Sequence, residues 1–196
     1  MLTSQILLWI AVLVLAVLVA ALARQVGILH ERIAPAGALT LHQKVKVGDA
    51  ATPMLLRALD GSSVTVGGKR DGRSQLIFFV SPDCPVCKFL LPVFKSAARA
   101  EADWLDALLA SDGDEAAQRR MVMEQGLGGT PFVLSEALGR SFGVSKLPYA
   151  VLLDDTGRVA SLGLINSREH LESLFEAKER GVASIQEFLA RREGEA

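Results

Sequence analysis

The sequence predicts an α/β domain, with a central mixed sheet flanked by helices, preceded by one transmembrane helix. Three observations support this fold class. An uncharged apolar run lies close to the N-terminus. Between residues 76 and 153, short apolar runs alternate with segments of helical periodicity, as in βαβ units. Two turns rich in Asp and Gly, at residues 60–61 and 154–157, each join two strand-like runs and predict β-hairpins.

The apolar run is ILLWIAVLVLAVLVAALA, residues 6–23, and it contains no charge and no proline. As a helix it would be about 27 Å long, close to the hydrocarbon thickness of a bilayer. Two alternatives are a buried core helix and a cleaved signal peptide, since Ala21-Leu22-Ala23 resembles a cleavage site. The run is long for a signal peptide and no Lys or Arg precedes it. These features favour an uncleaved, single-pass anchor over residues 1–24.

The remaining chain divides into a tether at residues 25–46 and a folded domain at 47–196. The tether lacks apolar periodicity and is broken around Pro35 and Gly37. Basic residues follow the anchor, and taken alone the positive-inside rule would leave the domain in the cytoplasm. The formal net charge of -1, from 21 basic and 22 acidic residues, offers no basic footprint for phosphates. We therefore expect no nucleic-acid partner.

The folded domain is expected to begin with a hairpin over residues 54–66, followed by a strand at 76–80 whose continuous apolar character is typical of burial on both faces. A helix should start at Pro85, with Pro92 introducing a kink. One face of this helix is predicted to point inward, through residues spaced by three and four: Val86, Phe89, Leu90, Val93, Phe94 and Ala97.

The second half continues the alternation of strands and helices. The expected elements are a strand at 105–110, a helix at 115–125 ended by glycines, a short strand at 132–133, a short helix at 135–142, a hairpin of strands at 149–153 and 158–164, and a helix at 167–180. Strands joined through a helix should pair in parallel. Asn166, with Glu169 three residues later, predicts the N-cap of the last helix.

Cys84 and Cys87 are the two cysteines of the chain, and they lie where the strand at 76–80 meets the next helix. Unpaired N–H groups and the helix dipole favour a thiolate there, and Pro85 suits the first helical position. We predict that Cys84 is the nucleophile. Cys87, one turn further along, would be shielded and would attack a mixed disulfide formed at Cys84.

Other uses of the pair are less favoured by its spacing. A structural disulfide closing so short a loop would remove little chain entropy. A metal site would need two further ligands, and the sequence has no second CxxC motif. We therefore expect no metal and no cofactor other than the cysteine pair itself. Asp83 and Lys88 flank the pair with opposite charges and are candidates for tuning the acidity of its thiols.

The CPVC pair at a helix start, the Leu147-Pro148 loop and the closing hairpin and helix resemble the thioredoxin superfamily. Val47-Gly48-Asp49 with the first hairpin is similar to its membrane-anchored subgroup. The resemblance implies a thioredoxin-like fold. It also implies that Pro148 is a cis-proline that faces the redox pair and, with Leu147, binds an extended substrate chain. Asp83 stands where the superfamily usually has an aromatic residue.

Three longer stretches resemble the MauD family of methylamine utilization proteins: residues 81–96, 146–157 and 163–189. This resemblance implies a thiol-disulfide oxidoreductase needed for maturation of the small subunit of methylamine dehydrogenase, whose disulfides it would form or isomerise. It implies a single-pass protein of the bacterial inner membrane with its domain in the periplasm, and a membrane redox partner of unknown identity. We therefore expect the domain in the periplasm, although the basic residues that follow the anchor favour the opposite orientation.

Two other functions remain open from the sequence. Ser81 places a hydroxyl group three residues before Cys84, a spacing that resembles peroxiredoxins and would suit a thiol peroxidase. A non-catalytic chaperone or metal-delivery module for the maturing subunit would not need the thiols for electron transfer.

Overall fold

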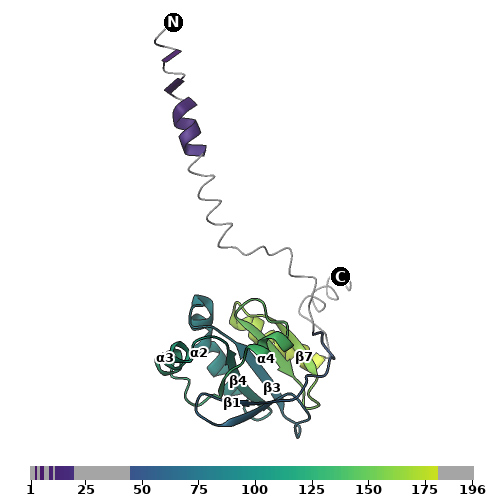
Figure 1. Cartoon of the computed structure of the whole chain (residues 1–196). Coiled ribbons are helices and arrows are strands. Elements are labelled where there is room, and N and C mark those ends of the chain that lie inside the picture. Colours follow the sequence, from purple (N-terminus) through teal and green to yellow (C-terminus); the bar gives the residue numbers. More distant parts are fainter. Residues whose placement is uncertain (1–2, 4, 7–8, 11, 20–44, 181–196) are drawn as a thin grey trace, which may run out of the picture. The chain divides into compact units, whose positions relative to one another are not determined.

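The computed structural model describes residues 45–180 and, near the N-terminus, residues 3, 5, 6, 9, 10 and 12–19 (Figure 1). The chain divides into two units between His42 and Gln43. In the first unit the described residues are helical. Among all described residues, no helix is both long enough and apolar enough to cross a membrane. The predicted anchor lies partly outside the described residues, and the predicted tether lies almost entirely outside them.

The second unit is built on a five-stranded mixed sheet with the strand order β5-β4-β3-β6-β7. The strands are β3 (Ser74–Phe79), β4 (Leu105–Ser111), β5 (Phe132–Leu134), β6 (Tyr149–Leu153) and β7 (Val159–Leu164). As predicted, β3, β4 and β5 pair in parallel, since helices connect them. Strand β6 pairs antiparallel with both β3 and β7. The strand from which the cysteine turn emerges is therefore the central one.

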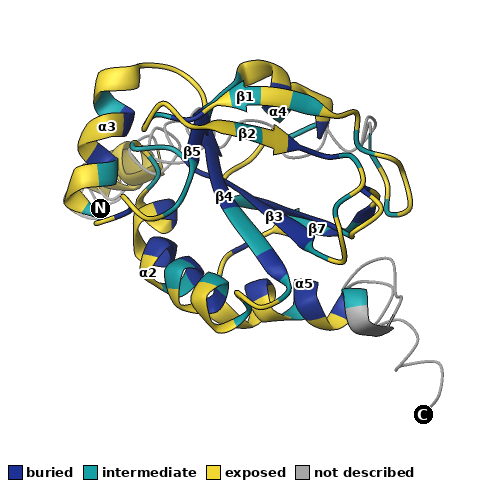
Figure 2. Cartoon of the chain, turned by 90° about the horizontal axis from the view of Figure 1, so that it is seen from below, coloured by how far each residue is buried: buried dark blue, intermediate teal, exposed yellow. Residues whose placement is uncertain are grey.

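The predicted first hairpin forms a separate two-stranded antiparallel sheet, β1 (Met54–Arg57) with β2 (Ser63–Val66). The helices described within residues 45–180 are α2 (Pro85–Ala100), α3 (Glu115–Glu124), α4 (Glu136–Ser141) and α5 (Arg168–Arg180). Figure 2 shows α2 and α5 on one side of the sheet and the β1–β2 hairpin with α4 on the other.

Strand β3 is buried along its whole length because both of its faces are covered. Leu76 and Phe78 point into the core formed with α2 and α5, where the ring of Phe78 stacks on that of Phe94 at a centroid distance of 5.1 Å. Ile77 and Phe79 contribute to the opposite core, with α4. This arrangement confirms the expectation drawn from the continuous apolar run.

Two details of the predicted helices were wrong. The N-cap of α5 is Ser167, not Asn166: the Ser167 hydroxyl accepts a hydrogen bond from the His170 N–H at 3.3 Å, whereas the Asn166 N–H donates to His170 Nδ1. In α2, Val86 and Phe89 are exposed rather than inward. The buried face runs through Cys87, Leu90, Leu91, Phe94 and Ala97. Each exposed residue precedes a buried one and lies about 100° around the helix from it.

A charged cluster ties β4 to the segment before β3. Asp106 accepts hydrogen bonds from Arg70 at 2.9 Å and from Arg73 at 2.6 Å. Burial of the Asp106 carboxyl group raises its pKa, but the hydrogen bonds and charges of the two arginines outweigh burial and hold the pKa below its ordinary value. The ionised form is thus favoured by folding.

We expect Asp106→Asn to lower the free energy of unfolding by about 1 kcal/mol at pH 7, a value kept small because the site is partly exposed. A carboxyl group whose pKa is lower in the folded than in the unfolded state stabilises the fold when it is ionised. This contribution is complete above the unfolded pKa of about 4 and is lost as the pH falls through the lower, folded pKa. Denaturation at pH 7 and near pH 2.5 should show that the difference in the free energy of unfolding between the variant and the wild type is smaller in acid. The exposed Asp71→Asn is the control, and an unchanged difference would contradict the prediction.

Candidate redox site

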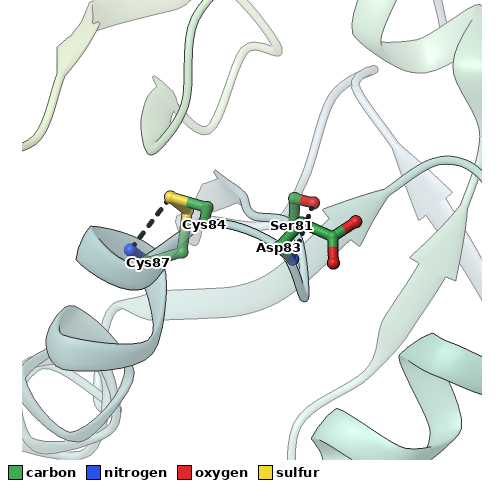
Figure 3. The surroundings of a disulfide bond; sticks show 4 residues. All are labelled: Ser81, Asp83, Cys84 and Cys87. Atoms are coloured by element: carbon green, nitrogen blue, oxygen red, sulfur yellow. Dashed lines mark hydrogen bonds between the residues drawn. A yellow bond between two sulfur atoms is a disulfide. The ribbon is translucent and has the colours of Figure 1, made fainter.

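The cysteine pair lies at the junction of β3 and α2 (Figure 3). Cys84 is the N-cap of α2 and Pro85 is its first residue, where a missing N–H costs no helical hydrogen bond. The turn before it is closed by Ser81, whose carbonyl accepts from the Cys84 N–H at 3.2 Å and whose hydroxyl accepts from the Asp83 N–H at 3.3 Å. The predicted position of Cys84 at a helix start is confirmed.

Cys84 and Cys87 form a disulfide, with their Cα atoms 5.2 Å apart. The Cys84 Sγ also accepts a hydrogen bond from the Cys87 N–H, with a sulfur-to-nitrogen distance of 3.1 Å. This is the contact that a serine or aspartate makes at an N-cap. In the reduced protein, the same N–H and the positive end of the α2 dipole would stabilise a thiolate on Cys84.

The two sulfur-bearing residues differ in exposure. Cys84 is half-buried, whereas Cys87 has 0% exposure and belongs to the core cluster that includes Leu90, Leu91 and Phe94. A partner molecule therefore reaches Cys84 first. Apolar surroundings disfavour a thiolate on Cys87. This difference fits the predicted roles, with Cys84 attacking or being attacked and Cys87 resolving.

The Leu147–Pro148 peptide bond is cis, as the resemblance implied. Pro148 is buried and Leu147 is 36% exposed. The next residue, Tyr149, pairs with Phe79 at the end of β3, which places the loop at the same edge of the sheet as the cysteine turn. The Pro148 carbonyl accepts a hydrogen bond from the Ile165 N–H at 3.0 Å, so the loop is held to the segment after β7. That Leu147 and Pro148 bind substrate stays a prediction.

Asp83 and Lys88 both have exposed side chains. Figure 3 shows the Asp83 carboxylate pointing away from the disulfide. Within the described part of the chain, the buried polar residues of the domain are Ser74, Gln75, Ser111, Gln118 and Ser161. None of these is a carboxylic acid, so no buried acid of the described residues can exchange a proton with Cys87. The role of Asp83 and Lys88 in tuning thiol acidity stays a prediction.

Sequence reasoning missed a cavity of about 330 Å³ at this edge. Its lining comes from the ends of β3 and β4, the start of α4 and the loop before Pro148, and includes Val80, Ala110, Glu136, Lys146 and Leu147. These segments are far apart in the chain, and no local pattern signals that they meet.

Comparison with known proteins first defines the class. The Redoxin family model matches residues 46–178. Among solved structures, StoA from Bacillus subtilis is similar with a TM-score of 0.55 and 20% identity, over 64% of this chain and 97% of its own. The dsbF protein of MTB, in its mixed oxidized and reduced forms, has a TM-score of 0.55 and 19% identity, over 64% of this chain and 94% of its own. At these identities the likeness shows the thioredoxin-like fold. With the CxxC pair in place, the chain is a redox protein of the thioredoxin type.

Closer relatives then define the family. The methylamine utilization protein MauD of Paracoccus denitrificans is 43% identical over 100% of this chain and 98% of its own. MauD of Methylorubrum extorquens is 44% identical over 98% of this chain and 93% of its own. The chain belongs to the MauD family.

Proposed function

We propose that the chain is a membrane-anchored thiol-disulfide oxidoreductase that forms or isomerises the disulfides of the methylamine dehydrogenase small subunit, in the periplasm. The observation that carries the proposal is the half-buried Cys84 at the start of α2, joined in a disulfide to a fully buried Cys87. Membership of the MauD family supports a place in methylamine utilization. The uncharged run at residues 6–23 supports the anchor.

In the oxidising direction, a substrate thiolate attacks the Cys84 Sγ. A bond forms between the substrate sulfur and Cys84, the Cys84–Cys87 bond breaks, and Cys87 leaves as a thiolate that takes up a proton. A second substrate thiolate then attacks the first substrate sulfur and releases Cys84. The substrate loses two electrons and the cysteine pair gains them. A membrane redox partner would accept these two electrons to restore the disulfide.

In the isomerising direction, the reduced pair starts the reaction. The Cys84 thiolate attacks a wrong substrate disulfide and releases one substrate thiolate, which then attacks another substrate disulfide. When the correct pairing has formed, Cys84 leaves, so no net electrons move. If rearrangement stalls, Cys87 attacks the mixed disulfide and releases a reduced substrate. In both directions the cysteine pair is the part of this protein that reacts, and neither exchange requires a metal or another cofactor.

The proposal is tested in a bacterium that grows on methylamine, by replacing the gene with one that encodes Cys84→Ser together with Cys87→Ala. Methylamine dehydrogenase activity in extracts should fall at least roughly tenfold, because the thiol chemistry is removed. The small subunit should carry free thiols that react with a maleimide probe. Met123→Ser, expressed at the same level, is the control.

Full activity in the double variant would contradict the proposal and support a non-catalytic chaperone or metal-delivery module. A purified chain that consumes peroxide rapidly through Cys84 but exchanges no disulfide would instead indicate a peroxidase. A reporter fused after Ala196, combined with thiol labelling of intact cells, tests the location. A cytoplasmic domain would overturn both the location and the proposed substrate.

A further inference from the structure

The helix α2 carries only positive charge. It contains Lys88, Lys95 and Arg99 and no acidic residue between Pro85 and Ala100. The chain as a whole is nearly balanced, with 21 basic and 22 acidic residues. The helices α3, α4 and α5 each have an acid in their first turn. The positive charge of α2 is therefore not offset by any acid of the same helix.

The three basic residues share one side of α2. Lys88, Lys95 and Arg99 are spaced by seven and four residues, so they fall within about 40° of one another around the helix axis. Lys88 and Arg99 are exposed, and Lys95 is partly buried. The Lys95 Nζ donates to the carbonyls of Gln125 at 3.3 Å and of Gly126 at 2.8 Å. These hydrogen bonds hold the Lys95 charge at the surface beside the end of α3.

Two hollows open next to this basic side of α2. One, of about 460 Å³, is lined by Pro92, Lys95, Ser96, Arg99 and Ala100. The other, of about 310 Å³, is lined by Lys95, Ala98, Arg99, Ala107, Gly126, Gly129 and Thr130. Lys95 and Arg99 border both hollows. An anionic group that enters from outside can therefore contact two cations, and charge-assisted hydrogen bonds of this kind are strong.

Apolar side chains stand next to the basic ones on the outward side of α2. Phe89 is 75% exposed and Val86 is 43% exposed, and the opposite face of the helix already supplies the core contacts. An exposed aromatic residue beside Lys and Arg is typical of helices that lie at a membrane surface. There the ring enters the headgroup region and the cations attract anionic lipids.

The acids near α2 leave the middle of its outward side basic. Asp83 precedes the helix and Glu101 follows it, where Glu101 accepts a hydrogen bond from the Trp104 Nε1 at 2.6 Å. On α5, which packs beside α2, Arg168 is paired with Glu172 at 3.5 Å, so this pair adds no net charge. The charge of the outward side thus favours an anionic surface.

We propose that the outward side of α2 binds an anionic phospholipid surface, with Lys95 and Arg99 on lipid phosphates and Phe89 in the headgroup region. The inference rests on the proposed function, which places the chain on a membrane through its anchor. Residues 25–46, at up to about 3.4 Å per residue, give the domain enough length to lie against the bilayer. Because Cys84 caps α2, docking brings the cysteine pair to the membrane surface, where the proposed redox partner would meet it.

The test uses the full-length chain in nanodiscs of phosphatidylcholine alone, or of the same lipid with phosphatidylglycerol added. A photoreactive benzophenone amino acid replaces Phe89, and lipid adducts formed on irradiation are measured by mass spectrometry. At low salt the adduct yield should be at least roughly fivefold higher with phosphatidylglycerol. This excess should disappear at high salt, because exposed charges are then screened.

The same probe at Leu55 controls for position. Leu55 is also 75% exposed, and it lies on β1, on the other side of the sheet from α2 (Figure 2). The chain is anchored in the same way in both experiments, so the local lipid concentration is matched. The yield at Leu55 should be low and independent of the lipid.

Variants of the probe-bearing chain then test the charges. Lys95→Gln with Arg99→Gln should bring the two yields within roughly twofold of each other. Arg99→Glu alone leaves the Lys95 hydrogen bonds in place and should lower the yield with phosphatidylglycerol at least roughly threefold. Lys46→Gln with Lys69→Gln removes the same number of charges from exposed residues outside α2, and it should keep the full excess.

Equal yields for the two lipids, from a chain that co-elutes with both nanodiscs, would overturn the docking surface and leave the proposed function standing. Adducts with a second copy of the chain in place of lipid would also overturn it, as would an equal loss in the control with Lys46 and Lys69 replaced. A chain that enters neither nanodisc would contradict the proposed anchor, and the docking surface with it.

Discussion

Replacing Cys84 with serine is expected to abolish disulfide exchange, whereas replacing Cys87 with alanine should leave a protein that accumulates mixed disulfides. Cys84 is the residue of the pair that a partner can reach. Its Sγ accepts a hydrogen bond from the Cys87 N–H, with a sulfur-to-nitrogen distance of 3.1 Å. Without that nucleophile the exchange rate should fall by roughly three orders of magnitude or more. Without Cys87 the first step still occurs from the reduced protein, but nothing resolves its product.

The measurement is non-reducing electrophoresis and mass spectrometry of each variant after mixing with a protein that carries a disulfide. Alanine is preferred to serine at position 87 because a hydroxyl group would enter an apolar core at a residue with 0% exposure. Trapped partners in Cys84→Ser, and none in Cys87→Ala, would reverse the two roles. Near-ultraviolet circular dichroism checks that both variants keep their packing.

Replacing Gly157 with alanine should cause a large loss of stability. Gly157 lies in the turn between β6 and β7 with φ at +79°, and a Cβ there would stand 2.6 Å from the carbonyl oxygen of Gly68 and 2.7 Å from its nitrogen. These are backbone atoms of the segment after β2, so relief requires the two segments to separate. The clash and the left-handed backbone together should lower the free energy of unfolding by roughly 3 kcal/mol or more.

Gly72→Ala provides a matched control. Gly72 also has positive φ, +72°, but no atom lies within 4 Å of the position of its Cβ. Gly72→Ala should therefore lower the free energy of unfolding by only about 1 kcal/mol, the cost of placing alanine in a left-handed backbone conformation. Chemical denaturation followed by tryptophan fluorescence gives both values. Equal losses would show that the close approach of Gly157 and Gly68 does not constrain the fold.

Much of the fold could be predicted because it depends on local patterns. The continuous apolar run at 76–80 indicated a strand covered on both faces, and the Asp-Gly turn at 60–61 indicated the first hairpin. The position of Cys84 as an N-cap followed from Pro85 and the apolar strand before it. These preferences depend on residues that are close together in the sequence, so they can be recognised without knowledge of the tertiary contacts.

Other features depend on contacts that no local pattern encodes. The rotation of α2 decides that Cys87 faces the core and Phe89 faces solvent, whereas apolar spacing alone allowed either residue on the inner face. The cap of α5 at Ser167 rather than Asn166 depends on where the first turn of the helix begins, a difference of one residue. The approach of Gly157 to Gly68 joins two segments that are far apart in the chain.

The buried position of Cys87 also protects the pair against irreversible damage. An oxidant that meets the reduced protein reaches Cys84 first and converts it to a sulfenic acid. Cys87, with its Cα 5.2 Å away, can then displace water and close the disulfide. Further oxidation to a sulfinic acid would need a second oxidant molecule before that closure. Accidental oxidation of this kind therefore ends in the ordinary oxidised form, from which the protein can re-enter its cycle.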